Sequence, residues 1–172
     1  MHTYGTAGDP EDRRAANLAG ALALAVGDRL RVDSDAAALV TLLERGRLTV
    51  EWLRRIVGLS HSATVRLVDR LAADGLVVRA PGPDRRSVRV ELTAAGWHEA
   101  ERIRCKRETT LASLLAQLSQ SERSAFSCAA EKLLAAATED RWGARSICRL
   151  CAHAVCAVAG CPVDEAATAL GE

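Results

Sequence analysis

The sequence predicts a mainly α-helical protein that carries one small β-hairpin. Of the 172 residues, 49% are hydrophobic but only 3% are aromatic. The core must therefore be built from Leu, Val, Ile and Ala, which favours packed helices. Apolar residues recur at helical spacing along most of the chain, and capping residues separate one run from the next. The period changes to strand-like alternation near residues 76–92.

Four helices are predicted before the hairpin. They span about residues 9–31, 34–44, 49–58 and 60–74. The first begins at Asp9-Pro10, an N-cap followed by proline at the first helical position. The second and third end at Gly46 and Gly58, and the fourth ends at Asp74-Gly75, as expected for glycine at helix C-termini.

A β-hairpin is predicted to follow the fourth helix. Residues 76–79 form a short apolar run, and residues 87–92 alternate polar and apolar side chains as a half-buried strand does. The loop between them, residues 80–86, is rich in turn residues and contains two arginines. A long helix from Thr93 to about residue 118 and another from Ser119 to about residue 140 complete this part.

The order of helix, helix, turn, helix and basic hairpin is typical of a winged helix-turn-helix fold. The tight turn at residues 58–60 would let the helix at 60–74 cross the previous one, so that its N-terminal end could enter a major groove. Arginines on the hairpin would bind the DNA backbone or an adjacent minor groove. The candidate DNA-binding residues are Ser60, His61, Ser62, Thr64, Arg66, Arg70, Asp84, Arg85, Arg86 and Arg89.

The charge distribution agrees with nucleic-acid binding. The whole chain has 23 basic and 22 acidic residues, a net charge of +1. Residues 45–107 hold 14 of the basic and 7 of the acidic residues, so the middle of the chain is positive and its flanks are negative.

The hairpin resembles the wing of the MarR-type transcriptional regulators. Asp84-Arg85-Arg86-Ser87-Val88-Arg89-Val90-Glu91-Leu92-Thr93-Ala94-Ala95-Gly96 is similar to the family signature D-x-R-(x)3-V-x-L-T-x-x-G, and residues 62–71 resemble the family's recognition helix. The resemblance covers about residues 12–140. It implies a homodimer on a pseudo-palindromic double-stranded operator, with Asp84 orienting the wing and Arg86 contacting DNA. The predicted regions are 1–32 (dimerisation helix), 33–93 (winged helix-turn-helix), 94–141 (dimerisation helices) and 142–172 (cysteine-rich segment), the last of which departs from the family pattern.

Four cysteines cluster after the last long helix. Cys148, Cys151, Cys156 and Cys161 form a C-x2-C-x4-C-x4-C run. On one continuous helix Cys161 would lie about 20 Å from Cys148 along the axis, so a helix cannot gather all four thiols. A chain that turns can, and Gly160 and Pro162 flank the last cysteine where a turn is needed. In a reducing cytoplasm such a cluster indicates a metal or redox site.

Three centres are compatible with this run. An iron–sulfur cluster, most simply 2Fe–2S, accepts four thiolates from compact irregular runs that end in Cys-Pro, and apolar neighbours would suit it. The run is also similar to the cysteine-rich loops of MerR-type 2Fe–2S sensors, with different spacing. Zinc is the first alternative, although it favours two C-x2-C pairs. Thiols that oxidise to disulfides are the second. The ligands would be Cys148, Cys151, Cys156 and Cys161.

The remaining candidates in this region are predicted to have structural roles. His153 is a possible alternate ligand but is expected to lie at the surface or next to the ligands, and Trp142 is expected to anchor the cysteine-rich segment. Cys105 and Cys128, which stand within helical patterns, are expected to be buried small hydrophobic residues.

These observations predict a non-enzymatic regulator. No nucleophile has an evident base, and no glycine-rich phosphate loop follows a strand. The longest apolar stretches are too short to cross a bilayer, which predicts a cytoplasmic protein. We therefore expect a dimeric DNA-binding regulator, more specifically a repressor, whose four-cysteine centre senses redox state or metal supply. The alternative is a metal- or electron-carrying protein that uses the winged fold for protein contacts.

Overall fold

The structure is a computed structural model that describes residues 9–30, 32–82 and 88–171, in two compact units, Met1–Val32 and Asp33–Glu172. The first unit consists of helix α1 (Pro10–Leu30), which buries none of its residues. Leu18 and Leu22, one helical turn apart, are both exposed, Leu18 by 58%. No helix within the described ranges is both long and apolar enough to cross a membrane.

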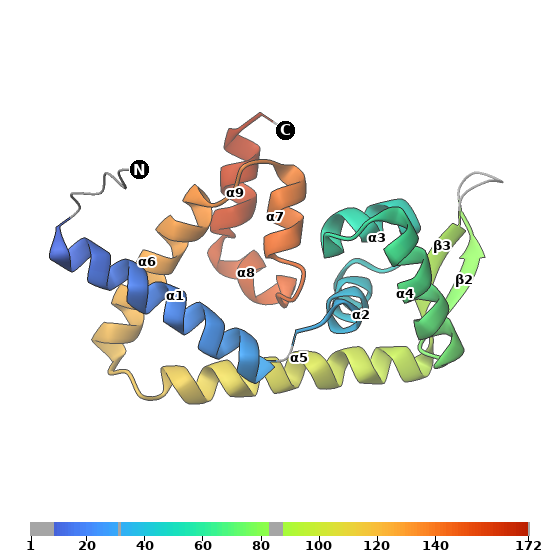
Figure 1. Ribbon diagram of the computed structural model, residues 1–172, viewed down its shortest axis with the longest axis horizontal. Coiled ribbons are helices and arrows are strands. Elements are labelled where there is room, and N and C mark those ends of the chain that lie inside the picture. Colours follow the sequence, from blue (N-terminus) through green and yellow to red (C-terminus); the bar gives the residue numbers. More distant parts are fainter. Residues whose placement is uncertain (1–8, 31, 83–87, 172) are drawn as a thin grey trace, which may run out of the picture. The chain divides into compact units, whose positions relative to one another are not determined.

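The second unit begins with the winged helix-turn-helix that the sequence predicts (Figure 1). Its elements are α2 (Ser34–Arg45), β1 (Leu48–Thr49), α3 (Val50–Val57), α4 (His61–Ala73), β2 (Val77–Pro81) and β3 (Val88–Leu92). The strands form an antiparallel sheet in the order β1-β3-β2, in which Val77 pairs with Leu92 and Pro81 with Val88. The predicted fold class is confirmed, although the two-residue strand β1 escaped prediction.

Local capping chemistry fixes the turn between α3 and α4. Thr49 and Ser60 each accept a hydrogen bond from a backbone N–H in the first turn of the following helix. Gly58 ends α3 in the left-handed conformation, with φ +76°, which favours glycine. Leu53 of α3 and Leu67 of α4 then lie fully buried in one core together with residues of α2, β2, β3 and α5.

Helix α5 (Ala94–Leu115) joins the winged region to the rest of the unit and packs along α2. Thr93 caps α5 and donates a hydrogen bond from its hydroxyl to the carbonyl of Gly75 (2.6 Å). A Cβ on Gly96 would lie 1.8 Å from the carbonyl oxygen of Leu76, so the first turn of α5 approaches the start of the wing too closely for any side chain. The predicted Thr-x-x-Gly motif therefore positions the wing.

Three further helices follow α6 (Gln120–Ala136), which starts with a capping box between Ser119 and Glu122. They are α7 (Arg141–Ile147), α8 (His153–Ala159) and α9 (Pro162–Ala169), and the sequence analysis did not predict them as helices. Helix α9 packs on α6 and α7, and α7 packs on α3 (Figure 1). We call residues 141–169 the cysteine segment.

Candidate functional site

The N-terminal end of α4 presents polar side chains to solvent, as expected for a recognition helix. Ser60 caps the helix, and His61, Ser62 and Arg66 are exposed. Arg66 makes no hydrogen bond or ion pair with the part of the chain that the structure describes, so its guanidinium is available to a base edge or a phosphate.

Thr64 does not belong to this surface, and its prediction as a DNA-binding residue is wrong. Its side chain is fully buried (0% exposed), and its hydroxyl donates a hydrogen bond to the Ser60 carbonyl (3.0 Å). The physical reason is the helical period: Thr64 lies three and four residues before Leu67 and Val68, which face the core. Its hydroxyl is used inside the helix instead.

Arg70 lies further along α4 and binds a carboxylate of α2. Its Nε and terminal nitrogen donate to Asp35 at 3.1 and 2.5 Å, and this hydrogen bonding raises the pKa of Arg70. A phosphate would have to compete with Asp35 for the same guanidinium. Arg79 of β2, which the sequence analysis did not select, bonds to Asp69 of α4 at 2.5 Å and so ties the wing to the recognition helix.

Of the wing, the structure describes strands β2 and β3 but not residues 83–87 between them. Arg89 is half-buried on β3, where it pairs with Thr49 of β1 and Ala80 of β2. The predicted contacts of Asp84, Arg85 and Arg86 lie outside the described residues.

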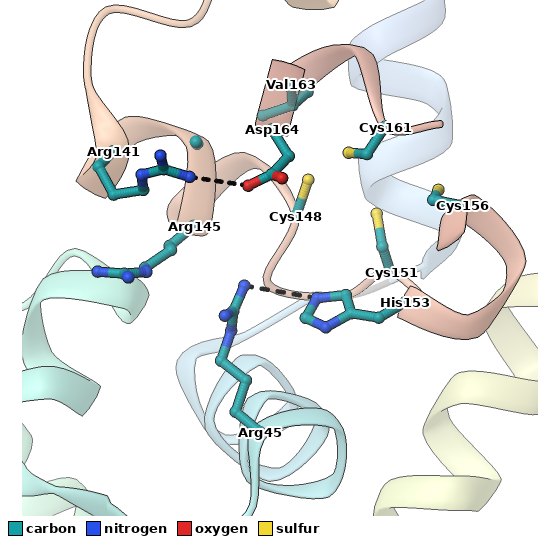
Figure 2. Close-up of a pocket in the computed structure, with 11 residues that line it drawn as sticks. Arg45, Arg141, Arg145, Cys148, Cys151, His153, Cys156, Cys161, Val163 and Asp164 are labelled. Atoms are coloured by element: carbon teal, nitrogen blue, oxygen red, sulfur yellow. Dashed lines mark hydrogen bonds and ion pairs between the residues drawn. The ribbon is translucent and has the colours of Figure 1, made fainter. Parts of the chain in front are cut away.

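The cysteine segment forms a second candidate site, a cavity of about 300 Å³ (Figure 2). Its lining consists of Arg45, Arg141, Ala144, Arg145, Cys148, Cys151, His153, Cys156, Cys161, Val163 and Asp164. The chain turns as predicted: Gly160 has φ +89°, and Pro162 starts α9 directly after Cys161. The turn therefore brings all four cysteines of the run to the lining of one cavity.

The pKa values of three of the clustered thiols are shifted by burial and by neighbouring thiols. The hydrogen bond from Cys148 lowers the pKa of Cys151 to about 6, with the Arg107 charge adding to it and burial opposing it. The pKa of Cys148 is raised, first by the same hydrogen bond and then by burial. The pKa of Cys156 is raised by burial and by the charge of Cys161. Cys151 is thus the thiolate at neutral pH.

The arrangement has the donors of a metal centre but not its convergence. Within the described residues, no three Cys, His, Asp or Glu side chains are placed to hold one metal ion. The thiols instead interact in pairs through side-chain hydrogen bonds: Cys151 with Cys148, Cys148 with Cys161, and Cys161 with Cys156.

Two expectations about the surroundings of the thiols are wrong. The cavity does not have the apolar surroundings that the neighbouring sequence indicates, because Arg45, Arg141 and Arg145 line it. Arg45 arrives from α2, about a hundred residues earlier, so inspection of the neighbouring sequence could not reveal it. Cys105 and Cys128 are exposed and not buried, because they lie on the outer faces of α5 and α6.

The cysteine segment is attached directly to the helix-turn-helix. The backbone N–H of His153 donates to the Glu44 carboxylate of α2 (2.9 Å), and the hydroxyl of Thr41, also on α2, donates to the carbonyl of Arg149 (3.3 Å). Trp142 of α7 meets Trp52 of α3 edge to face, with ring centroids 5.0 Å apart.

Two arginines complete this aromatic contact. The guanidinium of Arg145 lies 4.6 Å from the centre of the Trp52 ring and 4.8 Å from that of Trp142. Arg55 of α3 lies over the Trp142 ring, with its guanidinium carbon 4.8 Å from the ring centre. Trp142 was predicted as an anchor, but its partners on α3 were not.

Known proteins resemble this chain in both sequence and fold. The MarR family matches residues 33–87. An HTH-type transcriptional regulator of Mycobacterium tuberculosis (strain CDC 1551 / Oshkosh) is 35% identical over 107 residues, which cover 62% of this chain and 75% of the relative.

Two solved structures extend this similarity to the arrangement of the helices. A MarR family protein from Bacillus stearothermophilus is 30% identical, with a TM-score of 0.65 over 74% of this chain and 96% of its own. The RV1404 protein of Mycobacterium tuberculosis is 27% identical, with a TM-score of 0.62 over 75% of this chain and 96% of its own. The winged helix-turn-helix, its wing motif and these relatives together establish that the chain belongs to the MarR family of transcriptional regulators.

Proposed function

We propose that this protein is a dimeric repressor of the MarR type whose affinity for a pseudo-palindromic operator is controlled by the four clustered cysteines. One observation carries the proposal: the segment that gathers the four thiols packs on α2 and α3, the helices that support the recognition helix α4. A change in the thiol centre would therefore act on the DNA-reading surface through contacting side chains.

The DNA-binding part of the proposal rests on α4 and the wing. Ser60, His61, Ser62 and Arg66, which are exposed, would enter a major groove. Arg70, once released from Asp35, and Arg89 would bind the backbone beside it. The wing residues Asp84, Arg85 and Arg86 complete the proposed surface, as the family signature implies.

Dimerisation is supported by apolar side chains that the single chain leaves in water. Leu18, Leu22 and Leu24 of α1 are exposed, as are Phe126 and Leu133 of α6. Several exposed large apolar residues on the same helix are typical of an interface between subunits. A second copy of the chain is the proposed occupant, in agreement with dimer formation in the family.

For the centre itself we propose a 2Fe–2S cluster held by Cys148, Cys151, Cys156 and Cys161, with zinc or a thiol/disulfide switch as alternatives. The four-thiolate donor set fits either metal centre, and a bound cluster would supply a change of one electron as the signal. A centre with four thiolate ligands is anionic, and the cationic lining of the cavity would offset that charge.

Purified protein tests the proposal. The chain, isolated without oxygen, is analysed for iron, acid-labile sulfide and zinc and examined for visible absorbance. We expect about two iron and two sulfide per chain, the 2Fe–2S stoichiometry. DNA sites are then selected from a random duplex library, and affinity for them is measured before and after oxidation or chelation.

Serine variants identify which thiols matter. Serine at any of the four clustered cysteines should lower metal content and change the DNA response. Serine at Cys105 or Cys128, which are exposed elsewhere, serves as the matched control and should change neither. A full DNA response in the variant with all four clustered cysteines replaced would end the sensor hypothesis, and one zinc without colour would establish the zinc alternative.

A further inference from the structure

The cavity of the cysteine segment is lined by more guanidinium groups than carboxylates. Three arginines line it, against the single carboxylate of Asp164. Arg141 uses that carboxylate, with its terminal nitrogen 2.9 Å from the Asp164 oxygen. Arg45 and Arg145 are left facing the same space without an acidic side chain among the described residues (Figure 2).

Arg145 is the more unusual of the two. It forms no hydrogen bond or ion pair with any described residue, although it is half-buried. The faces of its guanidinium contact the rings of Trp52 and Trp142, which leaves the N–H groups along its edge without acceptors. Burial lowers the pKa of Arg145, and the charges of Arg45 and Arg141 lower it further. A guanidinium in this position is destabilised until an anion reaches it.

Arg45 reaches the cavity from a different helix than Arg145. It belongs to the last turn of α2, and its described contact is with the imidazole Nε2 of His153 at 3.5 Å, a group that carries no negative charge. Arg45 and Arg145 therefore come from two different helices, α2 and α7, and contribute positive charge to one cavity.

We propose that this cavity binds a small, multiply charged anion, an inorganic oxyanion or a small dicarboxylate, between Arg45 and Arg145. Guanidinium groups bind carboxylate and phosphate oxygens with paired hydrogen bonds, which fits both ligand sources. A volume of about 300 Å³ suits a small ligand. The bound anion would join α2 to α7 and hold the cysteine segment on the helix-turn-helix. This inference goes beyond the proposed function, because it requires neither a metal nor a cluster.

Calorimetric titration of the reduced, metal-free, full-length protein tests the site. One arm uses sodium phosphate and the other sodium succinate, with the ionic strength held constant by sodium chloride. We expect saturable binding of at least one probe, and the tighter arm identifies the oxyanion or the dicarboxylate as the preferred class. Arg145→Met, which keeps an apolar contact with the tryptophans, should raise the Kd at least tenfold.

Two more variants make the test specific. Arg45→Gln changes a side chain at a helix end and should also raise the Kd at least tenfold, even if Arg145→Met proves unstable. Arg102→Gln removes an exposed arginine that pairs with Glu99 on α5, outside the cavity, and should leave the Kd unchanged. Absence of saturable binding in both arms, or equal affinity in all three variants, would overturn the proposal. A failure to bind metal would refute the proposed 2Fe–2S centre but not this site.

Discussion

Replacing Trp142 with alanine should loosen the cysteine segment from the helix-turn-helix while leaving the winged core intact. The variant loses one edge-to-face aromatic pair with Trp52 and two cation–π contacts, from Arg55 and Arg145. Together these contacts contribute about 2–3 kcal/mol to the free energy of docking. Because each 1.4 kcal/mol is a factor of ten, backbone amides in residues 141–169 should exchange hydrogen roughly 30- to 150-fold faster.

Hydrogen-exchange mass spectrometry on the full chain measures this change peptide by peptide. Amides of the core strand β3 should keep their exchange rates, because Val90 is buried in a different cluster from the residues of α7. Trp97→Ala is the matched control, because Trp97 is 49% exposed on α5 and, among the described residues, its ring contacts the ring of His98. Unchanged exchange in the cysteine segment of Trp142→Ala would show that the tryptophan contact does not hold the segment.

Three further predictions concern DNA recognition, packing and the thiols. Arg66→Ala should alter the sequences selected from a random duplex library more than it alters affinity for non-specific DNA, because Arg66 is exposed on the recognition helix. Gly96→Ala should lower the free energy of unfolding in urea by about 1–3 kcal/mol because its Cβ would meet the Leu76 carbonyl, whereas Gly20→Ala, with nothing within 4 Å, should not destabilise the protein. In reduced metal-free protein, iodoacetamide should modify Cys151 at a rate that rises as the pH passes about 6, because the thiolate forms above its lowered pKa; a rise only near pH 9 would contradict this.

The winged region could be predicted from sequence because its signals are local. Thr49, Ser60 and Thr93 cap the helices that follow them, and each accepts the expected backbone hydrogen bond. The alternation in residues 87–92 agrees with strand β3, and Gly58 ends α3 as expected. Such features depend on a few neighbouring residues, so a single sequence contains the information.

The docking of the cysteine segment and the burial of Thr64 were not predicted. The first depends on contacts between distant residues, and the second on two conflicting local signals. The docking of Arg45, Trp52 and Glu44 against the cysteine segment brings together residues about a hundred positions apart, and no periodicity indicates such a pairing. Thr64 is different, because the helical period already groups it with Leu67 and Val68. A polar residue near the start of a recognition helix indicates DNA contact, but in Thr64 the helical period that places the side chain on the buried face decides the outcome.

The strength of the contacts between the cysteine segment and the helix-turn-helix decides whether regulation through them is physically reasonable. Allosteric coupling energies are typically about 1–3 kcal/mol, which changes affinity about 5- to 150-fold. The tryptophan contact lies in that range by the estimate above, and the hydrogen bond of His153 to Glu44 adds to it. A centre or ligand can therefore change DNA affinity only by the free energy with which it favours the docked over the undocked cysteine segment. Removing the contact should reduce that response even when the thiols and the recognition helix are both unchanged.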